Sequence, residues 1–215
     1  MGREFLGIFD EWAKDYDTSV AGLDPQYEAV FNGYERILDE VVRYSSGTVL
    51  EFGVGTGNLS EKLIQAGHQV IGVEPSSAML EIAAEKLPEL TLLEGDFLNF
   101  PDAGSIETIV STYAFHHLTD REKDTAIRQF AEMLPENGKI VFGDTMFKSI
   151  AAKESMIENA KDKGFFELAE DLEREYYTTI DVLQNIFVKY NFDVTFKQEN
   201  DFVWIVKANK FKRSG

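Results

Sequence analysis

Cysteine is absent from all 215 residues of the chain. Disulfide bonds, thiolate metal sites and cysteine nucleophiles are therefore excluded. The sequence also lacks an apolar run of about 18 residues, the length that a membrane-spanning helix requires. The first residues carry charges and include Trp12, where a secretion signal would have an apolar core. We therefore expect a cytoplasmic protein that does not associate with a membrane.

Positive charge is scarce. The chain has 21 lysines and arginines against 38 aspartates and glutamates, which gives a formal net charge of −17. Such a surface repels phosphate backbones, so no nucleic-acid partner is expected. The basic cluster from Lys207 to Arg213 lies at the C-terminal end. It is more simply explained as a solvated tail than as a binding site.

The most informative stretch runs from Val49 to Ser60 and reads as a buried strand, a glycine loop and the start of a helix. Its glycines alternate, and an acid, Glu51, precedes them; they are Gly53, Gly55 and Gly57. Glycines let the backbone turn sharply and approach a ligand, and the N–H groups that begin the next helix attract anionic groups. A dinucleotide fingerprint requires a third glycine at position 58, which is Asn58. The loop therefore predicts a nucleotide-type ligand but argues against a nicotinamide cofactor.

This acid-led loop resembles the first motif of class I S-adenosylmethionine-dependent methyltransferases. Three further stretches match that family in the expected order, each at the end of a predicted strand: Val70–Glu74, Leu92–Phe97 and Ile109–Leu118. The resemblance covers about residues 45 to 145. The two ends of the chain are also similar to the YrrT-like subgroup of bacterial methyltransferases. The implied activity is methyl transfer from S-adenosylmethionine, with S-adenosylhomocysteine as the product.

Strands and helices alternate from about residue 48 onward, which predicts an α/β fold with parallel strand pairing. Thr119 and Glu122 form a capping-box pattern before a helix. The last two strands, Phe192–Phe196 and Asp201–Val206, have so short a link that they must be antiparallel. The resemblance implies a Rossmann-like three-layer sandwich with helical lid elements. Its seven-stranded, mostly parallel sheet would have the order 3-2-1-4-5-7-6, with the seventh strand antiparallel.

We expect a single methyltransferase domain over residues 1–215. Its expected parts are an N-terminal helical lid, a cofactor-binding core, a helical insert over the acceptor site, and a last helix with the antiparallel strand pair. These parts span residues 1–44, 45–145, 146–178 and 179–208, respectively.

The resemblance also implies which residues contact the cofactor. Glu74 would accept hydrogen bonds from the ribose diol, and Asp96 with the Phe97 N–H would contact the adenine. Glu51 would order the loop or meet the ligand's ammonium through water, and Tyr16 would close over the methionine end. Each residue also has an alternative interpretation. Glu74 could be an ordinary acid at the start of a helix, and Asp96 an acid in the turn after a strand. Tyr16 could be an aromatic residue that docks a lid helix. The remaining cofactor contacts expected are Gly53, Gly55, Gly57, Pro75, Met79, Ser111 and Thr112, although a buried methionine such as Met79 is also ordinary core.

A general base is needed only if the acceptor arrives protonated. Candidates are His116, His117 and Asp144, which follow the fourth and fifth strands. Histidine suits the task because its pKa lies near neutrality. One histidine of the pair could instead only support the loop. No metal site is expected, because Asp144 is the one acid that could contribute to it.

The insert after the fifth strand is rich in aromatic residues, which favours a small, partly apolar acceptor. A monomer or a homodimer is expected. Two other functions stay open: a non-catalytic module that binds S-adenosylmethionine, and a nicotinamide oxidoreductase with an atypical loop.

Overall fold

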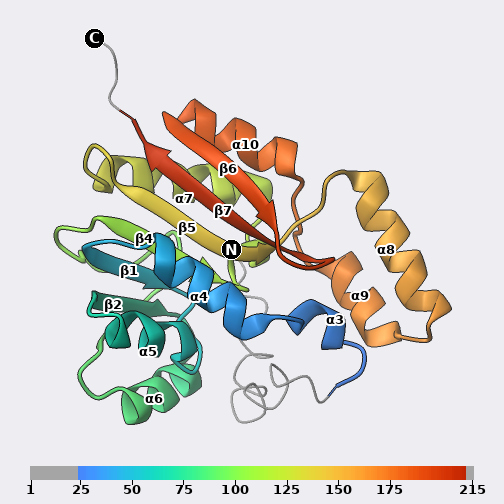
Figure 1. Cartoon of the computed structure of the whole chain (residues 1–215), viewed down its shortest axis with the longest axis horizontal. Coiled ribbons are helices and arrows are strands. Elements are labelled where there is room, and N and C mark those ends of the chain that lie inside the picture. The colour runs from blue at the N-terminus through green and yellow to red at the C-terminus, as the bar shows by residue number, and fades with distance from the viewer. Residues whose placement is uncertain (1–23, 212–215) are drawn as a thin grey trace.

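The computed structural model describes residues 24–211, and its centre is a seven-stranded sheet with the order β3-β2-β1-β4-β5-β7-β6 (Figure 1). Six neighbour pairs form the sheet: four are parallel, and β7 runs antiparallel to both β5 and β6. The predicted fold class and strand order are therefore confirmed. The strands are β1 (Thr48–Phe52), β2 (Gln69–Glu74), β3 (Thr91–Glu94), β4 (Thr108–Thr112), β5 (Lys139–Thr145), β6 (Phe192–Gln198) and β7 (Val203–Lys210).

Helices cover both faces of the sheet and make the three layers visible in Figure 1. On one face α4 packs on β5 and β7, while α5 packs on β2 and α6 on β2 and β3; on the other, α10 contacts α7 and β6. Two separate clusters of buried apolar side chains correspond to these faces. The helices are α4 (Tyr34–Tyr44), α5 (Asn58–Gln65), α6 (Ser77–Lys86), α7 (Asp120–Met133) and α10 (Ile180–Lys189).

Local sequence signals fix several helix ends. The predicted capping box is present: the Thr119 hydroxyl accepts from the Glu122 N–H, and the Glu122 carboxylate accepts from the Thr119 N–H at 3.0 Å. Ser76 caps α6 in the same way by accepting from the Met79 N–H. These contacts satisfy N–H groups that have no partner inside the helix. The capping bonds therefore fix the residues at which α6 and α7 begin.

The structure breaks a helix that the apolar pattern would continue. Apolar residues recur from Tyr27 to Val41, but α3 (Glu28–Phe31) ends before Gly33, and α4 begins after it. Gly33 has a φ of +78°, a left-handed conformation that stops a right-handed helix. The turn of the β6–β7 hairpin holds this break, because the Asn200 side chain donates to the carbonyls of Val30 and Asn32.

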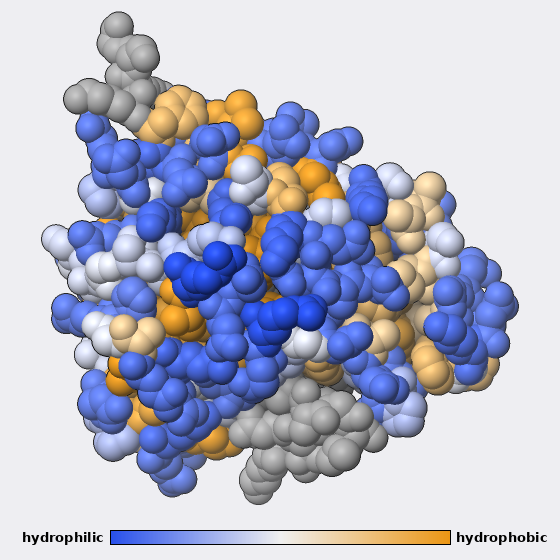
Figure 2. Space-filling model, in the orientation of Figure 1, coloured by the Kyte–Doolittle hydropathy of each residue, from blue (hydrophilic) through white to orange (hydrophobic). Residues whose placement is uncertain are grey.

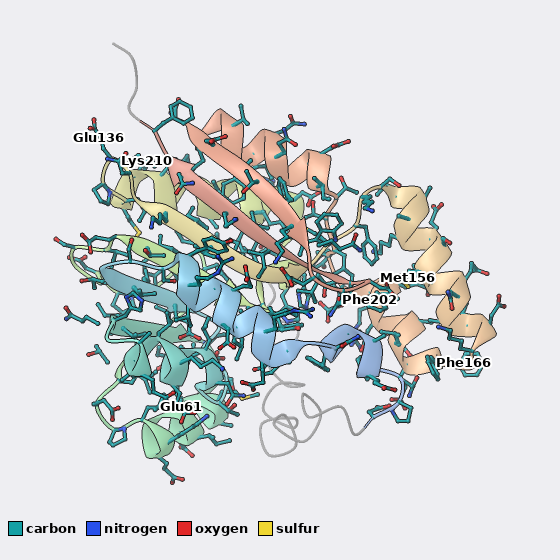
Figure 3. The ribbon with its side chains drawn as sticks, in the orientation of Figure 1. Glu61, Glu136, Met156, Phe166, Phe202 and Lys210 are labelled. Carbon is teal, nitrogen blue, oxygen red and sulfur yellow. The ribbon has the colours of Figure 1, made fainter. Side chains whose placement is uncertain are left out.

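The expectation of a solvated basic tail from Lys207 is wrong for its first part. Strand β7 extends to Lys210, because its backbone pairs with β5 on one side and β6 on the other. The Lys210 Nζ donates to the carbonyls of Ala131 and Leu134, each at 2.6 Å, at the end of α7 (Figure 3). A cation at a helix C-terminus is stabilising. These lysines are therefore structural, and residues 212–215 lie outside the described part.

The insert after β5 forms the hairpin of α8 (Ile150–Asp162) and α9 (Phe166–Arg174), which projects from one end of the sheet next to α3 (Figure 1). Tyr27 donates a hydrogen bond to Asp171, and the Gln26 side chain both donates to and accepts from Glu167. The N-terminal segment and the insert are thus joined at the point where α3 meets α9. Figure 2 shows a largely hydrophilic face with apolar residues over α8 and α9, where Ile150 and Phe166 are exposed.

No helix among residues 24–211 has the length and apolar character needed to cross a membrane.

Candidate functional site

The loop between β1 and α5 has the backbone that its glycines predict. Gly53, Gly55 and Gly57 all have positive φ values, +70°, +56° and +88°. A Cβ at Gly53 would lie 2.6 Å from the Cβ of Ala114, so this glycine also allows close packing. Among residues 24–211, no atom would lie within 4 Å of a Cβ at Gly55. Within this described part of the chain, the middle of the loop has room beside it for a ligand.

Glu74 ends β2 beside this loop. Its side chain is buried, and its two oxygens accept from the N–H groups of Gly55 at 3.0 Å and Ser76 at 2.9 Å. These bonds fix the direction of the carboxylate and tie the glycine loop to the start of α6. A carboxylate oxygen can accept more than one hydrogen bond, so a carboxylate held by backbone N–H groups can also accept from a ligand's hydroxyl groups.

Glu51 lies in β1 below the loop and is 1% exposed. Its described contact is with α5, since the Ser60 hydroxyl donates to its carboxylate at 2.5 Å. Burial raises the pKa of Glu51 to about 8, and the nearby Glu74 carboxylate adds to the increase. Glu51 is therefore mainly protonated at neutral pH, so an uncharged carboxyl group lies below the loop.

Asp96 and Phe97 follow β3 in the loop that the sequence predicted. One Asp96 oxygen accepts from the N–H groups of Leu98 and Asn99, both at 2.9 Å. The Phe97 ring stacks on Phe52 with the ring centroids 5.0 Å apart, so its side chain belongs to the core. Pro75 is half-buried and Met79 is buried at the start of α6.

Buried polar atoms without a partner gather at the end of β4. The Ser111 Oγ and the Tyr113 hydroxyl have no hydrogen-bond partner among the described residues. The Ser111 Oγ lies 3.9 Å from the position that a Cβ on Gly53 would occupy. Tyr113 has a φ of +52°, and Thr112 beside it is half-buried. Because buried polar groups are normally paired, these two hydroxyl groups are candidates for contact with a ligand.

His116 is fixed by Asp144. The histidine lies in the 3₁₀ turn η2 (Phe115–His117) after β4, and Asp144 is in β5. Asp144 accepts from the His116 Nδ1–H at 2.6 Å, from the His116 backbone N–H at 2.9 Å and from the Thr145 N–H at 2.7 Å. Burial alone would lower the pKa of His116, but the Asp144 carboxylate outweighs it and the net pKa is raised. His116 and Asp144 therefore form a buried, hydrogen-bonded pair.

His117 is held by Glu175, an acid that the sequence did not suggest. The His117 Nδ1 and Glu175 Oε2 are 2.8 Å apart, and Glu175 directly follows α9. Burial and the neighbouring His116 lower the pKa of His117, and Glu175 opposes them without reversing the direction. The two histidine rings have centroids 4.1 Å apart, and the Tyr177 ring stacks on His116.

The donor set here could also hold a metal ion. One ligand atom each of His116, His117 and Glu175 lies within 4.8 Å of the others. Within the protein, these side chains already form hydrogen bonds: His116 with Asp144, and His117 with Glu175. Buried Lys123 is a cation that acts on His116 and opposes a further positive charge. The expectation of no metal stays a prediction.

Comparison with known proteins shows the family of the chain. A family described as methyltransferase domain matches residues 49–138. An uncharacterized methyltransferase of Oceanobacillus iheyensis is 60% identical over 98% of this chain and 99% of its own length. One from Anoxybacillus flavithermus is 57% identical over 98% of this chain and 100% of its own.

The chain belongs to the class I S-adenosylmethionine-dependent methyltransferases.

Solved structures of the same fold agree with this membership. The magnesium protoporphyrin IX methyltransferase of Synechocystis PCC 6803, with bound S-adenosylhomocysteine, has a TM-score of 0.68 at 18% identity, covering 95% of this chain and 99% of that one. The phosphoethanolamine N-methyltransferase 2 of Haemonchus contortus has a TM-score of 0.70 at 17% identity, covering 99% of this chain and 60% of that one. At these identities the similarity is one of fold.

In this methyltransferase the predicted residues within 24–211 lie in the C-terminal parts of β1, β2, β4 and β5, or in the segments that follow β1, β2, β3 and β4. Tyr16 lies outside the described residues, so its role stays a prediction. Sequence reasoning missed Tyr113, Lys123 and Glu175. A buried lysine early in α7 could have been suspected from its place on the apolar face, but nothing local marks Glu175.

Proposed function

We propose that this methyltransferase moves the methyl group of S-adenosylmethionine to a small-molecule acceptor by in-line displacement. The observation that carries the proposal is the buried Glu74 carboxylate, oriented by Gly55 and Ser76 beside the open side of the glycine loop. A carboxylate held in this way suits a vicinal diol, because charge-assisted hydrogen bonds are the stronger ones.

The remaining cofactor contacts follow from the order of the strands. Asp96 and the Phe97 N–H would hold the adenine, with Pro75 and Met79 packed against it. The loop glycines and the end of β4 would hold the amino-acid end; these contacts are Gly53, Gly55, Gly57, Ser111, Thr112 and, from the N-terminal segment, Tyr16. Glu51 would support the loop from below. When bound, S-adenosylmethionine supplies a methyl group on a sulfonium that needs no further activation.

The insert after β5 would line the part of the site where the acceptor binds. The segment after α9 runs beside the end of β5, since the Phe147 N–H donates to the Thr178 carbonyl at 3.1 Å and Ile180 donates to the Phe147 carbonyl at 3.0 Å. The Thr178 hydroxyl is buried without a partner among residues 24–211. Together with the Tyr113 hydroxyl it offers hydrogen bonds to a polar acceptor in an aromatic setting. The joined α3 and α9 would cover the site and exclude water.

Catalysis then depends on alignment and on proton removal. Holding acceptor and methyl group in line can supply about 7–11 kcal/mol in well-oriented reactions. The group His116, His117 and Asp144 borders the place where strand order reverses, which is where such folds bind their ligands. One of these residues would take the acceptor proton.

A labelling experiment tests the proposal. The protein is incubated with S-adenosylmethionine carrying a tritiated methyl group and with a bacterial extract, which is afterwards separated into small molecules, protein and nucleic acid. We expect the label in the small-molecule fraction, and reduced transfer with Glu74→Ala at subsaturating S-adenosylmethionine. Label in protein or nucleic acid would contradict a small acceptor. Cofactor binding without any transfer would favour the non-catalytic module.

A further inference from the structure

We propose that His117 is the base of the methyl transfer, that Glu175 is the positioning residue that holds its tautomer, and that His116 is structural. This inference rests on the proposed function. It assigns different roles to two adjacent histidines that the sequence leaves equivalent, and it adds an acid from the helical insert. The evidence is the pair of separate hydrogen bonds that the two imidazole rings make.

Glu175 is held in place from several sides. It is 7% exposed, and its own N–H donates to the Asp171 carbonyl at 2.9 Å as the cap of α9. The next residue is anchored by Lys123, whose Nζ donates to the Tyr176 carbonyl at 2.7 Å. The backbone bonds between Phe147 and the residues after Tyr177 continue this anchoring. The carboxylate therefore has a fixed position against the turn η2.

His116 is unsuited to be the base. Asp144 accepts from both its ring and its backbone N–H, and the Tyr177 ring stacks on its face with an interplanar angle of 27°. Burial lowers the pKa of His116 and the Asp144 carboxylate raises it, with a net increase, so the contact with Asp144 stabilises the charged ring. Its side chain supports the turn that carries His117.

The partner of His117 comes from the helical insert: the His117 Nδ1 lies 2.8 Å from Glu175, whereas the partner of His116 belongs to the core strand β5. Donation from its Nδ1–H to Glu175 makes Nε2 the unprotonated nitrogen of the neutral ring, because the partner of one nitrogen sets the tautomer. The charged groups that act on this ring are Glu175 and Asp144, which favour its cation, and His116, which opposes it. Lys123 acts on His116, and Lys153 on α8 interacts with Glu175. Burial is the largest influence on the pKa of His117 and favours the neutral ring, while the Glu175 carboxylate lies in place to stabilise the charged form.

The proposed step balances with these groups alone. The acceptor's lone pair forms the new bond to the methyl carbon, and the carbon–sulfur bond breaks with its electrons going to sulfur. The proton on the attacking atom passes to His117 Nε2, and the imidazolium that forms is paired with Glu175. The acceptor is accordingly an amine, alcohol or thiol that still carries a proton on its nucleophilic atom. Acceptors without such a proton, for example tertiary amines, would gain nothing from this arrangement.

The tautomer is tested by nitrogen NMR of the protein with S-adenosylhomocysteine bound. We expect neutral His117 with its proton on Nδ1 near pH 7. In Glu175→Ala both tautomers appear, whereas the isosteric Glu175→Gln retains the Nδ1–H form because its amide oxygen still accepts. Glu173→Gln is the matched control: this acid is 52% exposed, pairs with Lys161 and should leave the His117 signals unchanged.

Kinetics tests the role in the reaction. The rate of label transfer into the same small-molecule extract is measured against pH at saturating S-adenosylmethionine. We expect Glu175→Ala to lower this rate at least tenfold and to change its pH profile, while Glu175→Gln and Glu173→Gln lose less. Unchanged rate and profile in Glu175→Ala, or a His117 that is charged or carries its proton on Nε2 in the wild type, would overturn the inference.

Titration of S-adenosylhomocysteine separates the two proposals. All four proteins should bind it with affinities within about twofold of one another, since Glu175 does not belong to the cofactor side. Loss of binding in the wild type would contradict the proposed function, whereas unchanged binding with an unchanged tautomer would contradict only the assignment of Glu175.

Discussion

Replacing Glu51 by glutamine should change how the stability of this methyltransferase depends on pH. Glu51 is 1% exposed, and its pKa in the folded protein is raised from 4.5 to about 8. Folded protein therefore holds a proton that unfolded protein releases above about pH 4.5, so the free energy of unfolding falls as pH rises. The decline ends once pH exceeds the folded-state pKa, where Glu51 is ionised in both states.

The size of the effect follows from the pKa shift. Each unit corresponds to about 1.4 kcal/mol, so full ionisation of Glu51 costs about 5 kcal/mol, and relaxation around the carboxylate makes this an upper bound. Glutamine fills the same space and keeps an oxygen that accepts from Ser60. Glu51→Gln should therefore be more stable than the wild type at about pH 9, with the difference vanishing near pH 4.5.

Urea unfolding measured between about pH 5 and pH 9.5 provides the test, because the midpoint and slope give the free energy of unfolding at each pH. The matched control is Glu61→Gln on α5, where the side chain is 40% exposed and pairs with Lys86 (Figure 3). Its curve should run parallel to that of the wild type. A Glu51→Gln curve that is also parallel to the wild type would refute the protonated, desolvated state of Glu51.

Three further predictions concern the loop, a helix end and metal dependence. Gly55→Ala should lose about 1–2 kcal/mol of stability from its positive φ alone. Gly53→Ala should lose more, because its Cβ would also meet Ala114 at 2.6 Å. Equal losses of the two variants in urea unfolding would contradict this prediction. Thr119→Ala removes the capping box of α7 and should cost about 1 kcal/mol, which thermal unfolding would detect. Dialysis against EDTA should leave the rate of methyl transfer unchanged, and recovery of a lost rate by Zn²⁺ would show a metal site at the histidine pair.

Most of the fold could be predicted from the sequence because its signals are local. The glycine loop after β1, the capping box at Thr119 and the short link before β7 each depend on neighbouring residues. The strand order came from family resemblance, since periodicity does not say which strands become neighbours. The break at Gly33 and the length of β7 were missed because each depends on tertiary contacts: the Asn200 clamp and pairing with β5.

The candidate site also contains both residues that could be predicted from the sequence and one that could not. His117 and Asp144 follow strand ends and could be identified from position. Glu175 could not, because it is 58 residues from its partner and directly follows an amphipathic helix with several exposed acids. The contact between His117 and Glu175 depends on two long-range interactions: Lys123 binds the carbonyl of Tyr176, and Phe147 pairs with Thr179. Together they hold the segment after α9 against η2. Long-range packing of this kind leaves no pattern in a single sequence.

Isothermal titration of S-adenosylmethionine, S-adenosylhomocysteine and NAD into the wild type and Glu74→Ala tests the central claim most directly. The account predicts binding of the first two ligands to the wild type, and no binding of NAD. Glu74→Ala should weaken both affinities by about 1–3 kcal/mol, roughly 5- to 150-fold, because a buried charge-assisted hydrogen bond is lost. Binding of NAD in place of the other two, or equal affinity in the variant, would contradict the account.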